Sequence, residues 1–195
     1  MTMLVRVPVK YSDLRQHGFC RGDLIPLQPE TLWRIEQGVV RTLTWSDEGT
    51  LTVLGYWGQG DVVGHPLSRL QPYIIECLTT VEASCIPSQQ WHHVLDAIFL
   101  HIQQTQELLN IVRTERVHQR LLHLLVWLTN KFGCEVKSGQ LINLRLTHQA
   151  LAELIGTTRV TVTRLLKQLE EEGIIDRPRR NCILLRKNHR LSLKG

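Results

Sequence analysis

The chain has 195 residues, of which 43% are hydrophobic and 21% charged, and its formal net charge is +5. This length and composition predict one or two globular domains. It has no uncharged apolar stretch of about 18 residues, and Arg6, Pro8 and Lys10 interrupt the apolar residues near the start, so neither a membrane span nor a secretory leader is predicted. We therefore expect a cytoplasmic protein without a membrane partner, whose moderate positive charge favours an acidic partner such as nucleic acid.

The first half of the chain carries short β-type runs separated by glycine and aspartate. The clearest runs are residues 31–37, 39–45 and 50–57. Turn signals at 37–38 and 46–49 predict that these three segments form a meander of hairpins. Such strands at nearly regular spacing, continuing to about residue 87, predict a β-barrel or sandwich.

A helix is predicted between residues 91 and 113, because residues on one stripe there alternate steps of three and four. The stripe consists of Leu95, Ile98, Ile102, Thr105, Leu109 and Val112. This is the spacing of a heptad seam, which favours a homodimer interface over a helix packed only on its own barrel. A second helix, over residues 115–131, has one apolar face and is expected to cover the segment that follows it.

Residues 147–172 predict two short helices joined by a tight turn. The apolar face of the first helix consists of Ala150, Leu151, Leu154 and Ile155, and that of the second of Val162, Leu165, Leu166 and Leu169. Thr147 is a suitable N-cap for the first helix, Gly156 can adopt the positive φ that ends it, and Thr157 or Thr158 can cap the second. The pattern favours a helix-turn-helix over a plain helical hairpin.

The opposite face of the second helix is basic. It carries Arg159, Val160, Thr163, Arg164 and Lys167. Within this second helix, acidic residues occur only at its far end, at 170–172. The cations therefore lie on the part of the helix that would enter the major groove of DNA if it is a recognition helix. Gly173 then breaks the helix, and two apolar runs around a turn with Arg177, Arg179 and Arg180 predict a β-hairpin. A basic hairpin beside a recognition helix is suited to phosphate contacts, which position a protein without reading sequence.

On these residues the chain shows a family resemblance: residues 115–186 resemble the winged C-terminal domain of the CRP/FNR superfamily of bacterial transcription regulators. The strings TRVTVTRLL at 158–166 and HQA at 148–150 are shared with the NtcA-type nitrogen regulators of cyanobacteria, a branch of that superfamily. The resemblance implies an α+β fold with an N-terminal cupin-like antiparallel β-roll (jelly roll), a long dimerisation helix and a C-terminal winged helix-turn-helix. We place these three parts at residues 1–90, 91–113 and 114–195.

The resemblance also implies the DNA contacts, because family positions that match Arg159, Val160 and Arg164 face base edges. A guanidinium can bond guanine O6 and N7 together, whereas valine can contact only an apolar group such as the thymine methyl. CRP itself has glutamate at the position of Val160, which argues against a CRP-type site. By resemblance to the NtcA-type regulators we expect an inverted repeat of GTA and TAC half-sites. Further candidates for DNA contact are Gln149, Thr158, Thr161, Thr163, Lys167, Arg177, Arg179 and Arg180.

Residues 60–78 occupy the place of the family's effector cassette. The candidate effector-binding residues are Val63, Gly64, His65, Arg69, Tyr73 and Arg116. Cyclic-nucleotide binders have a Glu and then an Arg-Ser or Arg-Thr pair in this cassette; without that cation, burying a phosphate costs several kcal/mol, which argues against cyclic AMP. NtcA-type regulators bind 2-oxoglutarate through arginines where this chain has Tyr73 and Glu115, so that effector is not supported either. Whether a small molecule binds through Arg69 or Arg116, or the dimer is competent without one, remains open.

The sequence also lacks a full set of ligands for the other cofactors that occur in the superfamily, an iron–sulfur cluster and haem. The cysteines are Cys20, Cys77, Cys85, Cys134 and Cys182. Their scatter predicts reduced thiols and argues against an iron–sulfur cluster. A single candidate ligand, His65, is not sufficient to predict a haem site. The alternative class, a cupin-type metalloenzyme or ligand-binding protein with a helical appendage, needs ligands from neighbouring strands, yet no H-x-H motif is present and His92 and His93 are adjacent. We therefore expect no metal and no catalytic residue, and as partners double-stranded DNA, a second copy of the chain and RNA polymerase.

Overall fold

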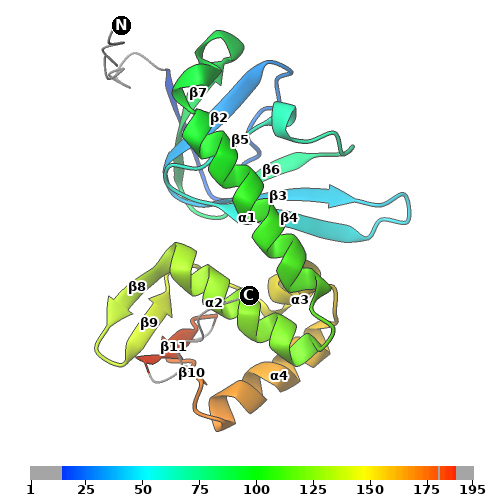
Figure 1. Ribbon diagram of the computed structural model, residues 1–195, viewed down its shortest axis with the longest axis vertical. Helices are drawn as coiled ribbons and strands as arrows, with labels where there is room; N and C mark the ends of the chain where they lie inside the picture. Colours follow the sequence, from blue (N-terminus) through cyan, green and yellow to red (C-terminus); the bar gives the residue numbers. More distant parts are fainter. Residues whose placement is uncertain (1–14, 180, 188–195) are drawn as a thin grey trace, which may run out of the picture. The chain divides into compact units, whose positions relative to one another are not determined.

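The computed structural model describes residues 15–179 and 181–187. These residues form an α+β fold and divide into two compact units. The first unit holds the described residues up to 43 together with 56–102, and the second holds 44–55 together with those from 103 onward. The division between residues 102 and 103 falls inside the long helix α1, Leu95–Arg113. Figure 1 labels this helix.

Two antiparallel sheets make up the β region. One has the strand order β1-β7-β2-β5, and the other the order β4-β3-β6. The strands of the first sheet are β1 Gln16–Phe19, β2 Thr31–Gln37, β5 Val62–Val63 and β7 Val81–Pro87, and those of the second are β3 Val40–Trp45, β4 Leu51–Trp57 and β6 Ile74–Cys77. The three strands that the sequence predicts most clearly are confirmed to within one residue, and so is the β-roll class of the domain.

The predicted meander of hairpins is right for its second hairpin, β3–β4, and wrong for its first. β2 pairs with β5 and β7, whereas β3 lies between β4 and β6, so the chain passes from one sheet to the other at the Gly38 turn. Gly38 has φ +91°, and a Cβ there would lie 2.2 Å from the carbonyl oxygen of Thr80, so a larger residue would clash with the backbone. A turn signal fixes where the chain bends but does not fix which strands become neighbours. That choice depends on burial, and β2 is buried on both faces for most of its length.

The start of α1 packs on the first sheet. Leu32, Val62, Ile86 and Val94 form a buried cluster, and Ile98 of α1 packs against it. The helix is preceded by a 3-10 helix, Ser88–His93, and a second 3-10 helix, His65–Leu67, lies in the cassette. Apolar contact with the sheet therefore fixes one side of α1, because each buried aliphatic side chain contributes about 1.5–3 kcal/mol.

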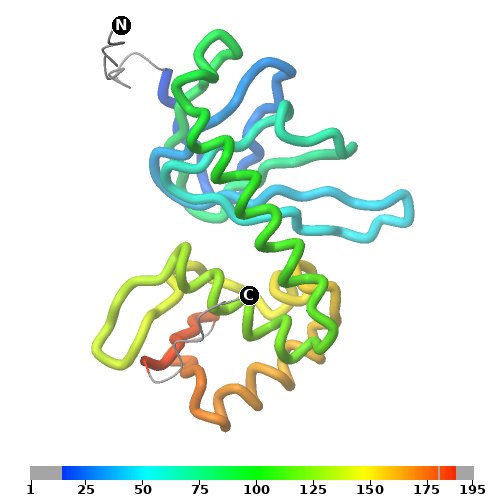
Figure 2. Tube along the Cα trace, in the orientation of Figure 1, coloured from blue at the N-terminus to red at the C-terminus, as the bar shows by residue number. Residues whose placement is uncertain are grey.

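The second unit contains three further helices and a small sheet. The helices are α2 Val117–Phe132, α3 His148–Ile155 and α4 Arg159–Glu171, and the sheet has the order β10-β11-β9-β8 with β8 Gly133–Val136, β9 Gly139–Ile142, β10 Ile175–Asp176 and β11 Leu184–Arg186. The predicted second helix, both helices of the helix-turn-helix and the wing hairpin β10–β11 are confirmed. Figure 2 follows the chain from β9 through α3 and α4 into that hairpin. No helix in the described part of the chain is both long and apolar enough to cross a bilayer.

The hairpin β8–β9 was not predicted from the sequence. Three of the four residues of β8 are exposed, so the strand shows no hydrophobic alternation. Its place in the sheet comes instead from pairing of β9 with β11, where a Cβ on Gly139 would lie 2.0 Å from the carbonyl oxygen of Leu185. Glycine at this position allows the two backbones to approach, and this joins the wing to the rest of the unit.

Candidate nucleic-acid interface

The two helices of the helix-turn-helix are set by local hydrogen bonds. The Thr147 side chain accepts a hydrogen bond from the backbone N–H of Ala150 at 3.0 Å, and Thr158 does the same for Thr161 at 3.1 Å. Gly156 ends α3 in the left-handed region, with φ 64°. Of the two predicted caps for the second helix, Thr158 is therefore the one used. Each such cap stabilises its helix by about 1 kcal/mol.

Helix α4 buries one face and exposes the other, as the sequence predicts. The buried residues are Val162, Leu165, Leu166 and Leu169, and the exposed residues include Arg159, Val160, Thr163, Arg164 and Lys167. Val160 is 78% exposed, although it is a large apolar residue. A shallow cavity of about 520 Å³ is lined by all five exposed residues and by Arg177 of the wing. An apolar side chain ringed by cations on an open surface is suited to a partner that has both negative charge and methyl groups.

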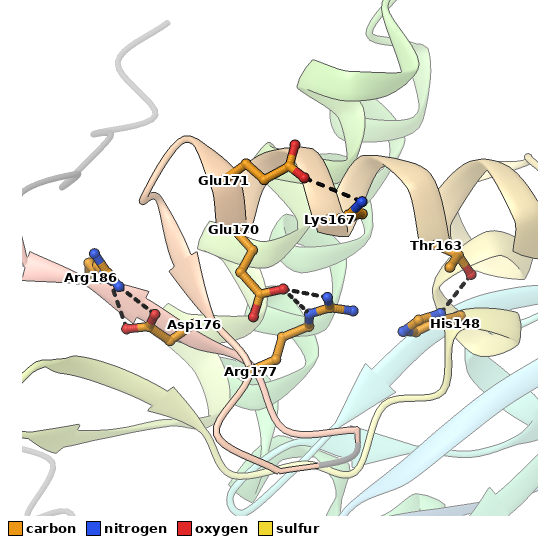
Figure 3. A network of polar contacts seen from close by, with 8 residues as sticks. All are labelled: His148, Thr163, Lys167, Glu170, Glu171, Asp176, Arg177 and Arg186. Atoms are coloured by element: carbon orange, nitrogen blue, oxygen red, sulfur yellow. Dashed lines mark hydrogen bonds and ion pairs between the residues drawn. The ribbon is translucent and has the colours of Figure 1, made fainter.

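The wing reaches α4 through an ion pair. The guanidinium of Arg177 bonds the Glu170 carboxylate through Nε at 3.0 Å and also through Nη2 (Figure 3). At the base of the wing, Arg186 bonds Asp176 through Nε at 2.8 Å and holds the pKa of that carboxyl below its usual range. Glu170 was not expected in the site, because the sequence places it among the acids at the far end of the helix. The ion pair fixes the position of Arg177 beside the recognition helix.

A second, larger cavity lies between α3, α4 and the wing turn. Its volume is about 590 Å³, and it is lined by Thr147, His148, Gln149, Arg159, Glu170, Arg177, Arg179 and Asn181. The structure thus brings predicted residues from all three segments together. It also adds His148 and Asn181, which were not among the residues predicted to contact DNA. Asn181 has φ 61°, a conformation that asparagine tolerates better than most residues and that shapes the tip of the turn.

Among the remaining residues predicted to contact DNA, some have polar groups that already form hydrogen bonds within the protein. The hydroxyls of Thr158 and Thr161 lie 2.9 Å apart, and the Gln149 amide donates to Glu153 at 3.0 Å. Arg179 is exposed at the tip of the wing. Arg180 lies outside the described residues.

The candidate effector residues fall into two groups. Val63, Gly64 and Tyr73 are buried together inside the first unit, where the Tyr73 hydroxyl bonds Gly64 and Thr42, and burial raises its pKa. His65 is half-buried, and Arg69 is exposed. Arg116 is exposed at the N-terminus of α2 in the second unit. Within the first unit, therefore, the exposed side chain of Arg69 does not lie with the buried candidate residues of the cassette.

Helix α1 exposes an apolar stripe that differs in part from the predicted seam. Leu95, Phe99, Ile102 and Leu109 are each exposed by 47% to 59%. Ile98 instead packs on the first sheet, so Phe99 takes its place on the exposed stripe. The other two predicted seam residues, Thr105 and Val112, are exposed and half-buried respectively. A stripe of large apolar side chains on one helix is typical of a protein interface.

Metal-ligating residues do not gather anywhere in the described part of the chain. Among residues 15–179 and 181–187, no group of three or more His, Cys, Asp or Glu side chains is placed to hold a metal ion. The cysteines in this part are all free.

The chain is similar to known proteins in sequence and in fold. The Crp-like helix-turn-helix domain family matches residues 119–192. The regulatory protein CysR of Synechococcus elongatus is 41% identical over 169 residues, which is 84% of this chain and 81% of that protein. The global nitrogen regulator of the same organism is 40% identical over 82 residues, or 42% of this chain and 37% of that protein. A CRP/FNR-family transcriptional regulator from Thermus thermophilus has a similar structure, with a TM-score of 0.71 over 88% of this chain and 93% of that one at 24% identity. The chain therefore belongs to the CRP/FNR family of DNA-binding transcription regulators.

Proposed function

We propose that this regulator binds, as a homodimer, an inverted repeat of GTA and TAC half-sites, and that it acts in the cytoplasm on transcription by RNA polymerase. The exposed face of α4 carries the proposal. Arg159 and Arg164 flank Val160 there, so two guanidinium groups able to bond guanine lie beside an apolar group able to contact a thymine methyl. Glu170 is already bound to Arg177, so it leaves the face basic.

The apolar stripe of α1 supports the homodimer. Leu95, Phe99, Ile102 and Leu109 lie at steps of four, three and seven, which is the spacing that two parallel helices need to pack along one seam. A two-fold axis along this seam would present two α4 helices. Two such helices read successive major grooves when the half-site centres lie about 34 Å apart, so a symmetric dimer requires a palindromic site.

The interior of the roll supports a further part of the proposal, that the signal is not a cyclic nucleotide. In the cassette 60–78, Arg69 is the only lysine or arginine, and it is exposed. Tyr73 and Trp57 fill the buried space instead, and the Trp57 indole donates to Thr42 at 2.9 Å. A phosphate placed there would be buried without a cation from the cassette.

The proposed function is tested by the binding of purified protein, without any added small molecule, to a duplex with GTA and TAC half-sites at physiological salt. We expect binding to be at least about a thousandfold tighter than to a scrambled duplex, because this ratio is the usual lower limit for the affinity of specific over non-specific DNA binding. A stoichiometry of two chains to one duplex is expected from sedimentation. Equal affinity for both duplexes, with or without candidate metabolites, would contradict the proposed sequence preference.

A phosphate-contact variant separates positioning from reading. Replacing Arg179 by alanine is expected to weaken binding to every duplex by the same factor and to remove about one phosphate contact per subunit, because Arg179 is exposed at the tip of the wing. The slope of log affinity against log salt should fall by about 0.9 for each phosphate that the protein no longer neutralises. Arg21→Ala, which removes an exposed arginine from the first unit, is the charge-matched control. An unchanged slope for Arg179→Ala would contradict the role of the wing.

A further inference from the structure

His148 follows the N-cap of α3 and bonds directly to the recognition helix. Its Nδ1 lies 2.8 Å from the hydroxyl oxygen of Thr163. That hydroxyl donates its only proton to the backbone carbonyl of Arg159, also at 2.8 Å. The histidine must therefore be the donor in the bond to Thr163, so Nδ1 carries a proton. In the neutral ring, Nε2 then has a lone pair and no proton.

The ring of His148 lies at a cavity rich in cations. Figure 3 shows it between Thr163 and the guanidinium of Arg177, with the second ring nitrogen on the side of Arg177. The charged residues that line the same cavity are Arg159, Glu170, Arg177 and Arg179. Glu170, the one carboxylate among them, is bound to Arg177. Along α3, Glu153 accepts a bond from Gln149, and on α2, which packs against α3, Arg120 is bound to the carbonyl of Ile155. No carboxylate in these contacts is left to stabilise a charged imidazole.

We propose that His148 binds a phosphate of the DNA backbone and takes up a proton when it does so, which makes the affinity for DNA depend on pH. This inference rests on the proposed function, because the phosphate is supplied by the duplex that α4 reads. A neutral Nε2 would turn its lone pair toward a phosphate oxygen, and the two would repel each other. A protonated Nε2 donates a charge-assisted hydrogen bond, with Nδ1 still held by Thr163.

The direction of the pH effect follows from the charges on each side of the binding step. Without DNA, burial and the guanidinium groups of Arg177 and Arg159 hold the pKa of His148 below its ordinary value. A phosphate at Nε2 favours the charged ring and raises that pKa. Binding therefore strengthens as the pH falls through the pKa of the bound state, and it levels off below the pKa of the free state. Between those two values each subunit takes up as much as about one proton, so the dissociation constant of a dimer changes by up to about a hundredfold per pH unit.

Two substitutions separate the two ring nitrogens. In His148→Asn the side-chain amide lies near the position of Nδ1, so it can keep the bond to Thr163 but has no group at the position of Nε2. In His148→Gln the amide can reach the position of Nε2 and donate there, yet it does not titrate. The chain has nine histidines, so the informative quantity is the difference in pH dependence between each variant and the wild type.

The experiment measures fluorescence anisotropy with a labelled palindromic duplex between pH 5.5 and 8 at constant ionic strength. For the wild type we expect the dissociation constant to fall at least tenfold across this range as the pH is lowered. We expect the contribution of His148 to this pH dependence to be absent from both variants, so that each varies less with pH than the wild type, with His148→Gln binding more tightly than His148→Asn. Calorimetry in two buffers of different ionisation enthalpy should show proton uptake by the wild type that both variants lack.

The possible results distinguish this inference from the proposed function. If the wild type binds the palindrome selectively and His148→Gln keeps the same pH dependence and proton uptake, His148 is not the group that titrates, and the inference is overturned. If the wild type does not prefer the palindrome at any pH, the proposed function itself fails. Circular dichroism and the melting temperature of each variant exclude loss of fold as the cause of weak binding.

Discussion

Replacing Ile102 by aspartate is expected to convert the dimer into monomers and to abolish selective DNA binding. Ile102 is 48% exposed on a single chain and lies between Phe99 and Leu109 on the apolar stripe of α1. In a dimer seam the new carboxylate would be desolvated next to its symmetry mate, without a cation, which costs several kcal/mol. We expect the dimer dissociation constant to rise at least a hundredfold, or about 3 kcal/mol. Sedimentation velocity over a range of concentrations measures this change.

Gln103→Asp is the matched control for that substitution. Gln103 is exposed and is the next residue on the same helix, so the variant adds the same charge beside the seam and not within it. It should remain dimeric and should bind the palindromic duplex within a few-fold of the wild type. If Ile102→Asp also remained dimeric, the apolar stripe would not be the interface, and the symmetry argument for a palindromic site would lose its basis.

The sequence predicted the local features of the fold and missed several that depend on tertiary contacts. The caps at Thr147 and Thr158 and the glycine that ends α3 are short-range chemistry, and the structure has all three. The hairpin β3–β4 is present as predicted, but the first hairpin of the meander failed because β2 pairs with β7, about fifty positions away, a relation that no local pattern carries. Ile98 shows the same limit. Its heptad spacing suits a seam, but the position of the sheet decides which side of α1 is covered.

The candidate site was predictable where one helix carries it and was missed where separate segments meet. The basic face of α4 could be read from periodicity alone. His148 and Glu170 could not, because their roles arise only when α3 and the wing are folded against α4. The available signal for His148 was its place directly after an N-cap, at the start of the first helix of the helix-turn-helix. The bond to Thr163, which gives that place a meaning, links residues 15 positions apart.

Replacing Arg159 by alanine is expected to remove the preference for guanine at the first position of each half-site. Arg159 is the first residue of α4 and is exposed, so its guanidinium can extend into the groove ahead of the helix. Loss of a bidentate contact to guanine costs about 1–3 kcal/mol at each half-site. A dimer uses two half-sites, so the loss on the palindromic duplex should be roughly twice that figure. Competition among duplexes with each of the four bases at this position measures the preference directly.

Arg159→Lys separates the charge of the side chain from its shape. Lysine keeps the positive charge but lacks the planar fork that matches guanine O6 and N7. It should therefore retain most of the salt dependence of the wild type, while discriminating less well between guanine and adenine than arginine does. Arg164 provides a comparison on the same face, since it lies further along α4 and should affect a different base pair. If Arg159→Ala and Arg159→Lys weaken binding to all four duplexes by equal factors, Arg159 contacts the backbone, and the reading of the first base must be assigned elsewhere on α4.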